Sequence, residues 1–228
     1  MSELIIELAV FDMAGTTVDE KNVVYKTLQK AINEKGYGLS LDFVLEHGAG
    51  KEKHQAIKDI LERHTGKSDP ELAGTIFTEF QGMLKQAYAE LSVGTYVGVE
   101  DLMDALRMGG VKIALNTGYD TKTAQLLLDR MKWTIGLQYD ALITADDVEK
   151  GRPAPDMILK AMEILQINDP SKVLKVGDSI IDIEEGKNLP CGMTVGVTTG
   201  AHTRKQLASA GPTFVLDSLW SLRDILLP

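Results

Sequence analysis

An almost entirely apolar run leads directly into an aspartate near the start of the chain. Residues 4–10 read LIIELAV, and FDMAGTTVD follows at 11–19 without a break. Such a run is typical of a strand that is buried on both faces of a parallel sheet. We therefore expect Asp12 at the carboxyl end of that strand, where ligands bind in open α/β sheets and a carboxylate can act as a nucleophile or a metal ligand. An Asx turn that only leads the chain out of the strand is the structural alternative.

Three further segments place polar side chains where a predicted strand ends or a helix begins. They read KIALNTG at 112–118, KGRPAPD at 150–156 and VLKVGDSIID at 173–182, and their candidate site residues are Thr117, Gly118, Arg152, Asp178 and Asp182. Neighbouring parallel strands end at the same sheet edge, so we expect these groups to converge on one crevice with Asp12. Two alternatives stay open, because Arg152 also suits a solvated loop and Asp182 also suits the first turn of a helix.

The order of the predicted elements indicates an α/β fold with a helical insertion. Helical patterns at 99–108, 121–131, 156–165 and 181–188 alternate with strand patterns at 112–116, 139–144, 173–177 and 193–197. This alternation predicts βαβ units and a parallel sheet that helices cover on both faces. Residues 17–95 carry helical patterns only, at 22–35, 51–64 and 69–91. We therefore expect a core domain at 1–16 and 96–228 and a helical cap domain at 17–95.

Composition and charge exclude several classes of function. The chain has 228 residues, 44% of them hydrophobic, which suffices for a packed interior. Its formal net charge of −9 disfavours a nucleic-acid partner, which demands clustered Lys and Arg. The single cysteine, Cys191, excludes an intramolecular disulfide framework and fits a reducing compartment. The sequence has neither a signal peptide nor a membrane span by pattern, so we expect a cytoplasmic protein without a membrane partner.

The ordered set of core motifs resembles the four motifs of the haloacid dehalogenase (HAD) superfamily, whose core is Rossmann-like. The resemblance implies that Asp12 is the nucleophile toward a phosphoryl group. Attack by a carboxylate on this anion needs a cation to offset the repulsion, and hard oxygen ligands suit Mg²⁺. The expected ligands are Asp12, Asp178, the carbonyl of Ala14 and, in one of its two interpretations, Asp182. The expected substrate-binding groups are Ala14, Thr16, Thr117, Gly118, Tyr119 and Arg152.

The residue at position 14 indicates which branch of the superfamily this chain resembles. Most HAD phosphatases carry a second aspartate there, which protonates the leaving alcohol, whereas this chain has Ala14. General acid catalysis typically contributes about 10²- to 10⁴-fold, so a leaving group that needs no proton is favoured. The form Asp-x-Ala-Gly-Thr resembles the phosphonatase branch, which cleaves a carbon–phosphorus bond through a lysine Schiff base. The segment GAGKEKH at 48–54 resembles its cap motif and implies Lys51 as the imine-forming lysine and His54 as its proton-handling partner.

Because this chain departs from the phosphonatase pattern at two positions, its sequence does not identify the substrate. This chain has Asn22 where that branch has a cysteine, and His47 where it has a methionine. We expect a small-molecule phosphonate such as phosphonoacetaldehyde. The alternatives are a phosphomonoesterase of the phosphoglycolate phosphatase type and a catalytically silent protein that binds a phosphorylated metabolite. The apolar face of the 22–35 helix suits either the interior of the cap or a second copy of the chain in a homodimer.

Overall fold

A six-stranded parallel sheet forms the core of the computed structural model, which describes residues 6–226. Leu4 and Ile5 of the opening apolar run lie outside the described residues. The strands are β1 (Leu8–Asp12), β4 (Lys112–Asn116), β5 (Ala141–Ile143), β6 (Val173–Gly177), β7 (Met193–Val197) and β8 (Phe214–Leu216). Their order is β5-β4-β1-β6-β7-β8, so β1 is central, and the expected α/β fold with a parallel sheet is confirmed.

The strand order places the switch point of the sheet at β1. The chain passes from β1 to β4 and β5 on one side and then returns to β6, β7 and β8 on the other. Asp12 lies opposite Asn116 of β4, and Phe11 lies opposite Val176 of β6. The crevice outside such a reversal is where open α/β sheets bind ligands. The carboxyl ends of β1, β4 and β6 therefore open into one site.

Helices cover both faces of the sheet because the strands alternate their side chains. Ala9 and Phe11 of β1 join the larger core cluster, whereas Leu8 and Val10 join a second cluster on the opposite face. The covering helices are α5 (Val99–Met108), α6 (Thr121–Met131), α7 (Asp156–Leu165), α8 (Ile180–Asn188), α9 (Arg204–Ser209) and α10 (Arg223–Leu226). Short 3₁₀ turns span Ala145–Asp147, Pro170–Lys172 and Leu219–Leu222.

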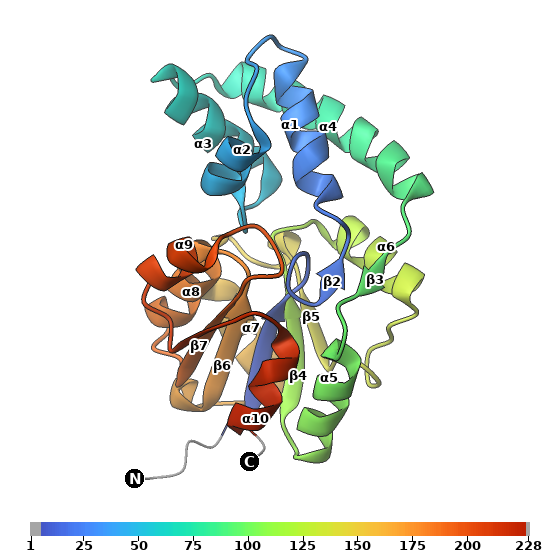
Figure 1. The fold of residues 1–228 in the computed structure, drawn as a ribbon, viewed down its shortest axis with the longest axis vertical. Helices are drawn as coiled ribbons and strands as arrows, with labels where there is room; N and C mark the ends of the chain where they lie inside the picture. Colours follow the sequence, from blue (N-terminus) through green and yellow to red (C-terminus); the bar gives the residue numbers. More distant parts are fainter. Residues whose placement is uncertain (1–5, 227–228) are drawn as a thin grey trace.

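Four helices lie beyond the carboxyl ends of the strands, between β2 (Val18–Asp19) and β3 (Gly94–Thr95) (Figure 1). They are α1 (Val23–Asn33), α2 (Leu41–Gly48), α3 (Lys53–Thr65) and α4 (Pro70–Glu90). β2 and β3 pair antiparallel and join the two linkers of the insertion. This short ribbon and α2 are additions to the helical patterns expected for 17–95. The domain boundaries themselves stay a prediction.

Side-chain caps decide where the inserted helices begin. Asp69 accepts a hydrogen bond from Leu72 N at the start of α4, as the Asp-Pro signal predicts. Glu52 accepts from His54 N (2.7 Å) and Gln55 N (2.8 Å) and so fixes the start of α3. The helix expected from residue 51 therefore begins at Lys53, and Lys51 lies in the preceding loop.

The apolar face of α1 packs inside the insertion. Val24, Leu28 and Ile32 are buried, and α1 packs against α2 and α4. Of the two alternatives for this apolar face, the structure therefore supports packing inside the cap. Across residues 6–226, no helix combines the length and the apolar character that crossing a bilayer requires.

Candidate active site

Three carboxylates meet at the carboxyl ends of β1 and β6. Asp12 is the last residue of β1, Asp178 follows β6, and Asp182 lies in the first turn of α8. One oxygen of each lies within 4.8 Å of the others. Ser179 donates to Asp182 Oδ2 at 2.5 Å, and Thr16 donates to Asp178 Oδ1 at 3.3 Å. The structure therefore brings together the predicted nucleophile and two of the predicted metal ligands.

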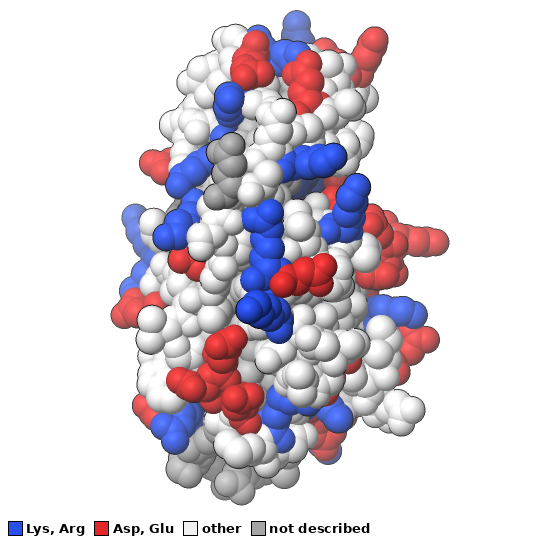
Figure 2. Space-filling model, turned by 90° about the vertical axis from the view of Figure 1, so that its right-hand side faces the viewer, with Lys and Arg blue, Asp and Glu red and all other residues white. Residues whose placement is uncertain are grey.

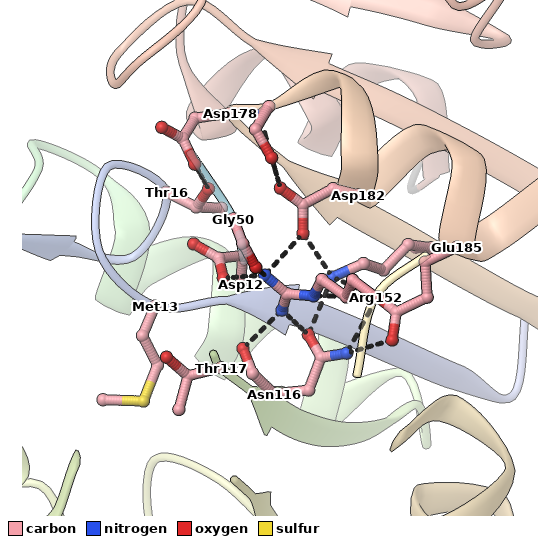
Figure 3. A network of polar contacts seen from close by, with 12 residues as sticks. Asp12, Met13, Thr16, Gly50, Asn116, Thr117, Arg152, Asp178, Asp182 and Glu185 are labelled. Carbon is pink, nitrogen blue, oxygen red and sulfur yellow. Dashed lines mark hydrogen bonds and ion pairs between the residues drawn. The ribbon is translucent and has the colours of Figure 1, made fainter. Parts of the chain in front are cut away.

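Arg152 occupies the centre of this site (Figure 3). Its Nη1 lies 2.7 Å from Asp12 Oδ1 and 3.0 Å from Asp182 Oδ1, and its Nε lies 3.1 Å from Glu185 Oε2. Its Nη2 donates to both oxygens of Asn116, at 2.9 and 2.7 Å. The guanidinium is fully buried, so the solvated-loop alternative for Arg152 does not hold. It fixes the orientation of Asp12 through charge-assisted hydrogen bonds.

Lys175 is a second buried cation that the sequence analysis missed. Its Nζ lies 2.9 Å from Asp182 Oδ1 and 3.2 Å from Glu185 Oε2, and it donates to Asn116 Oδ1 at 2.7 Å. Asn116 in turn donates to both oxygens of Glu185 at 3.1 Å. A lysine in the middle of an apolar, doubly buried strand is the signal that reveals such a network, because an isolated charge is too costly to bury.

The carboxylates perturb one another in a way that fits a bound cation. Burial raises the pKa of Asp12 to about 6, and burial together with Asp12 and Asp182 raises the pKa of Asp178 well above its ordinary range. Burial alone would raise the pKa of Asp182, but Arg152 and Lys175 hold it below its ordinary value.

The donor set also suits a hard divalent cation. Among the described residues, Asp12, Asp182 and Glu185 form ion pairs only with Arg152 and Lys175. Asp182 Oδ1 forms ion pairs but accepts no hydrogen bond of good geometry, and Asp178 has no cationic partner among the described residues. Oxygen ligands with spare charge are what Mg²⁺ prefers. The predicted ligands Asp12, Asp178 and Asp182 therefore fit such an ion, although their ligation stays a prediction.

Five of the six predicted substrate-binding groups line a small pocket beside Asp12, and the sixth, Thr16, is not among its lining residues. The pocket has a volume of about 10 Å³, and its walls include Ala14, Thr117, Gly118, Tyr119 and Arg152. Thr117 Oγ1 accepts from Tyr119 N at 3.2 Å, which leaves its hydroxyl proton free to donate into the pocket. In this closed arrangement the pocket has room for about one water molecule.

A cap loop closes the small pocket, and two glycines allow its close approach. Gly50 has a φ of +76°, and a Cβ there would lie 2.6 Å from Ser179 Oγ. A Cβ at Gly118 would lie 2.8 Å from the carbonyl oxygen of Lys51. Gly50 N donates to the hydroxyl of Tyr25 at 2.9 Å. The loop thus rests directly on the catalytic end of the sheet and brings the start of α3 to it.

The two lysines of this cap segment point in different directions. Lys51 forms an ion pair with Asp59 of α3, and both side chains are about a third exposed. Lys53 is only 6% exposed and lines the small pocket together with Asp12. Its Nζ lies 5.4 Å from the ring centroid of Tyr25 and 5.1 Å from that of Tyr119, and it donates to the Lys51 carbonyl at 2.5 Å. The structure therefore does not bring Lys51 Nζ to the nucleophile, but it does bring Lys53 there.

Burial makes Lys53 a weaker base than an ordinary lysine. Burial lowers the pKa of Lys53 from 10.5 to about 8, against the smaller opposing effects of Glu52 and Asp12. At neutral pH roughly one-tenth of such amines are uncharged and nucleophilic. Lys53 was not among the predicted site residues. Its position two residues after Lys51 in the same motif was the only signal available in the sequence.

The remaining cap candidates lie away from the three carboxylates. His54 lines a larger neighbouring cleft, stacks obliquely on Phe77 at 5.2 Å, and its Nε2 has no hydrogen-bond partner. Asn22 is the left-handed N-cap of α1, and His47 lies edge-on to Phe43 at 4.4 Å. Neither Asn22 nor His47 is among the residues that line the small pocket or the cleft.

Glu20 is a further buried acid that the sequence analysis missed. It is 1% exposed and accepts a hydrogen bond from Val24 N at 3.0 Å at the start of α1. Burial raises its pKa from 4.5 to about 7, against the opposing effects of the Val24 and Val23 amides and Lys53. Glu20 thus contributes a titratable group to the linker between β2 and α1.

Comparison with known proteins relates this geometry to a family. The family model described as haloacid dehalogenase-like hydrolase matches residues 6–189. The phosphonoacetaldehyde hydrolase of Latilactobacillus sakei subsp. sakei (strain 23K) is 31% identical over 260 residues, which cover 97% of this chain and 95% of the relative.

Two crystal structures share the fold. A phosphonoacetaldehyde hydrolase-like protein from Oleispira antarctica gives a TM-score of 0.82 at 24% identity, covering 97% of this chain and 91% of that one. A predicted phosphoglycolate phosphatase from Haemophilus somnus 129pt gives a TM-score of 0.75 at 21% identity, covering 96% and 97%. At these identities the two structures support the fold alone.

Proposed function

The chain belongs to the haloacid dehalogenase-like hydrolases and, within them, to the phosphonatase-like branch, and we propose that it cleaves the carbon–phosphorus bond of a phosphonate that carries a neighbouring carbonyl. In this proposal Asp12 is the nucleophile and a cap lysine is the imine former. The observation that carries the proposal is the buried amine of Lys53, which faces the Asp12 pocket in a chain whose general-acid position is Ala14.

The imine removes the need for the general acid that Ala14 cannot provide. The uncharged amine of Lys53 adds to the substrate carbonyl, and the adduct takes up one proton from solvent and loses water to give a protonated imine. Asp12 then attacks phosphorus as the carbon–phosphorus bond breaks, and the electron pair of that bond moves into the iminium to form an enamine. Protonation of the enamine carbon and hydrolysis of the imine release the carbonyl product and restore the lysine. Water hydrolyses the aspartyl phosphate to phosphate and Asp12. No leaving oxygen requires a proton, so an aspartate at position 14 is not needed.

The core groups hold the phosphoryl end of the substrate. Arg152 orients Asp12 and adds positive charge, and Thr117 and the amide of Gly118 donate to phosphoryl oxygens. Ala14 and Thr16 complete the loop around them. Mg²⁺ held by Asp12, Asp178 and the Ala14 carbonyl, with Asp182 in reach, would neutralise charge on the phosphoryl group.

Lys53 takes the place that the sequence analysis gave to Lys51. Lys51 forms an ion pair with Asp59, and an amine held in an ion pair is a poor nucleophile toward a carbonyl. The role of His54 as the proton carrier stays a prediction, as do a cytoplasmic location and a homodimer formed through the cap. Light scattering on the purified protein tests the homodimer.

Acetaldehyde release from phosphonoacetaldehyde with Mg²⁺ tests this function, with phosphoglycolate hydrolysis as the reference. Acetaldehyde and phosphate formed in equal amounts, and lost on chelation of the metal, would support the proposal. Phosphate from phosphoglycolate without any acetaldehyde from the phosphonate would overturn it in favour of a phosphomonoesterase. No turnover of either substrate, with phosphate bound in Lys53-dependent fashion, would indicate a binding protein instead.

A further inference from the structure

A large cleft adjoins the small phosphoryl pocket on the side of α4 and α6. Its volume is about 720 Å³, within the ordinary range for small-molecule sites, whereas the pocket at Asp12 has about 10 Å³. Lys53, Gly118 and Tyr119 line both spaces. The cleft therefore adjoins the pocket at these three residues.

The walls that α4 and α6 contribute to the cleft are largely aromatic and aliphatic. Phe77, Phe80, Leu84 and Tyr88 come from α4, and Leu126 comes from α6. The hydroxyls of Tyr88 and Tyr119 belong to residues that are 1% and 4% exposed, and they lie beside each other, away from the accessible surface of the cleft. The surface that a ligand would meet is therefore mainly the aromatic and aliphatic side chains of α4 and α6.

The charges around the cleft cancel. Three lysines and three carboxylates line it: Lys53, Lys85, Lys122, Glu52, Asp120 and Asp146. The face of the molecule with α4 and α6 likewise mixes basic and acidic side chains (Figure 2). Such a lining offers no net attraction to a second phosphate or to a strongly basic group. The expected occupant is an uncharged, largely apolar body.

From this geometry we infer that the cleft binds an apolar or aromatic substituent on the carbonyl carbon of the substrate, which makes the preferred substrate a substituted 2-oxoalkylphosphonate. The inference rests on the proposed function, because the imine places the carbonyl carbon at Lys53. With the phosphoryl group at Asp12 and the carbonyl at Lys53, a substituent on the far side of that carbon enters the cleft. In phosphonoacetaldehyde this position carries only hydrogen, which leaves the cleft empty.

Two ketones test the inference at constant carbonyl chemistry. They are phosphonoacetone and its homologue in which a benzyl group replaces one methyl hydrogen. Burial of the added group predicts a kcat/KM for the benzyl homologue at least about tenfold above that of phosphonoacetone. A ratio of one or below, in a protein that cleaves both, would overturn the inference.

A filled cleft provides the variant test. Leu126→Trp places a larger side chain at the cleft and is expected to lower the ratio of the two kcat/KM values at least about fivefold. The matched control is Leu159→Trp, a partly exposed leucine of α7 that is not among the lining residues, and it should keep the wild-type ratio. Equal ratios in the two variants would contradict the inference.

A binding measurement separates failure of the cleft from failure of the imine chemistry. Phenylpropylphosphonate and methylphosphonate have no carbonyl, so their dissociation constants by calorimetry do not depend on Lys53 as a nucleophile. Tighter binding of the phenylpropyl compound, lost in Leu126→Trp, supports the cleft even if no ketone is cleaved. Equal binding of the two probes, in an enzyme that does cleave phosphonoacetaldehyde, overturns the cleft and leaves the proposed function standing.

Discussion

The core and the cap contribute to the site in opposite ways. On the core side each charged group has several fixed partners: Arg152 contacts Asp12, Asp182, Glu185 and Asn116, and Lys175 contacts three of the same network. On the cap side Lys53 has one carbonyl acceptor, and aromatic and aliphatic side chains of α4 line the cleft beside it. The core is thus organised in advance for a constant phosphoryl group, whereas the cap offers one amine and an apolar cleft for the variable part of the substrate.

The largest effect is expected on the core side. Asp12→Asn removes the nucleophile and should lower turnover of any phosphonate by about a thousandfold or more. Steady-state phosphate release measures this loss, and an unchanged thermal melting curve would show that the fold is intact. Turnover within tenfold of wild type in the folded variant would exclude Asp12 as the nucleophile.

Substitution of the two cap lysines should lower activity to very different extents. Lys53→Met removes the imine former and should lower acetaldehyde release by about a hundredfold or more, because the electron sink is lost. Lys51→Met breaks only a partly exposed ion pair, worth about 0.5 kcal/mol, and should keep activity within about threefold. Acetaldehyde release measures both. The reverse pattern would restore the sequence-based assignment of Lys51.

The buried core cation should matter for stability as well as for the site. Lys175→Met leaves Asp182 and Glu185 with Arg152 as their remaining cation and should lower the free energy of unfolding by about 3 kcal/mol. Lys172→Met, which removes a partly exposed pair with Glu7, is the control and should cost less than about 1 kcal/mol. Urea unfolding compares the two. Similar losses in both variants would show that the buried network is not a coupled unit.

The smallest effect is expected at Glu20, in the linker between β2 and α1, and depends on pH. The folded state raises the pKa of Glu20 from 4.5 to about 7, so it binds the proton more tightly than the unfolded chain does. The stability that protonated Glu20 contributes is complete below pH 4.5 and is lost as the pH rises through about 7.

Glu20→Gln should therefore flatten part of the decline in stability between pH 5 and 8, by on the order of 2 kcal/mol relative to wild type. Glu34→Gln, at an exposed glutamate just after α1, is the matched control and should leave the wild-type slope. Urea unfolding at a series of pH values gives both slopes. Parallel curves for wild type and Glu20→Gln would contradict the raised pKa of Glu20.

The sequence predicts the core side of the site well because strand ends are local signals. An apolar run that stops at a polar residue identifies Asp12, Thr117 and Asp178, and parallel pairing then brings them to one edge. Lys175 and Glu185 escape this logic, since Lys175 lies within its strand rather than at the end, and Glu185 is one of several charges on α8. Their meaning depends on how β6 and α8 pack against each other, which no local pattern shows.

The cap side is less predictable for a related reason. The start of α3 at Lys53 depends on the side chain of Glu52, and the direction of each lysine depends on how the cap loop rests on the core. The segment GAGKEKH alone does not show which of its two lysines, Lys51 or Lys53, reaches the nucleophile. The cleft beside them joins α4 to core loops far away in sequence, so its size also follows only from the folded arrangement.

Borohydride trapping of the substrate on the enzyme tests the central claim most directly. Wild-type protein with phosphonoacetaldehyde and sodium borohydride should carry a reduced adduct, and peptide mass spectrometry should locate it at Lys53. Trapping should become faster as the pH rises through about 8, because the free amine is the reacting form. An adduct at Lys51 would show that the cap rearranges to present the other lysine. The absence of any adduct during active turnover would refute the imine mechanism.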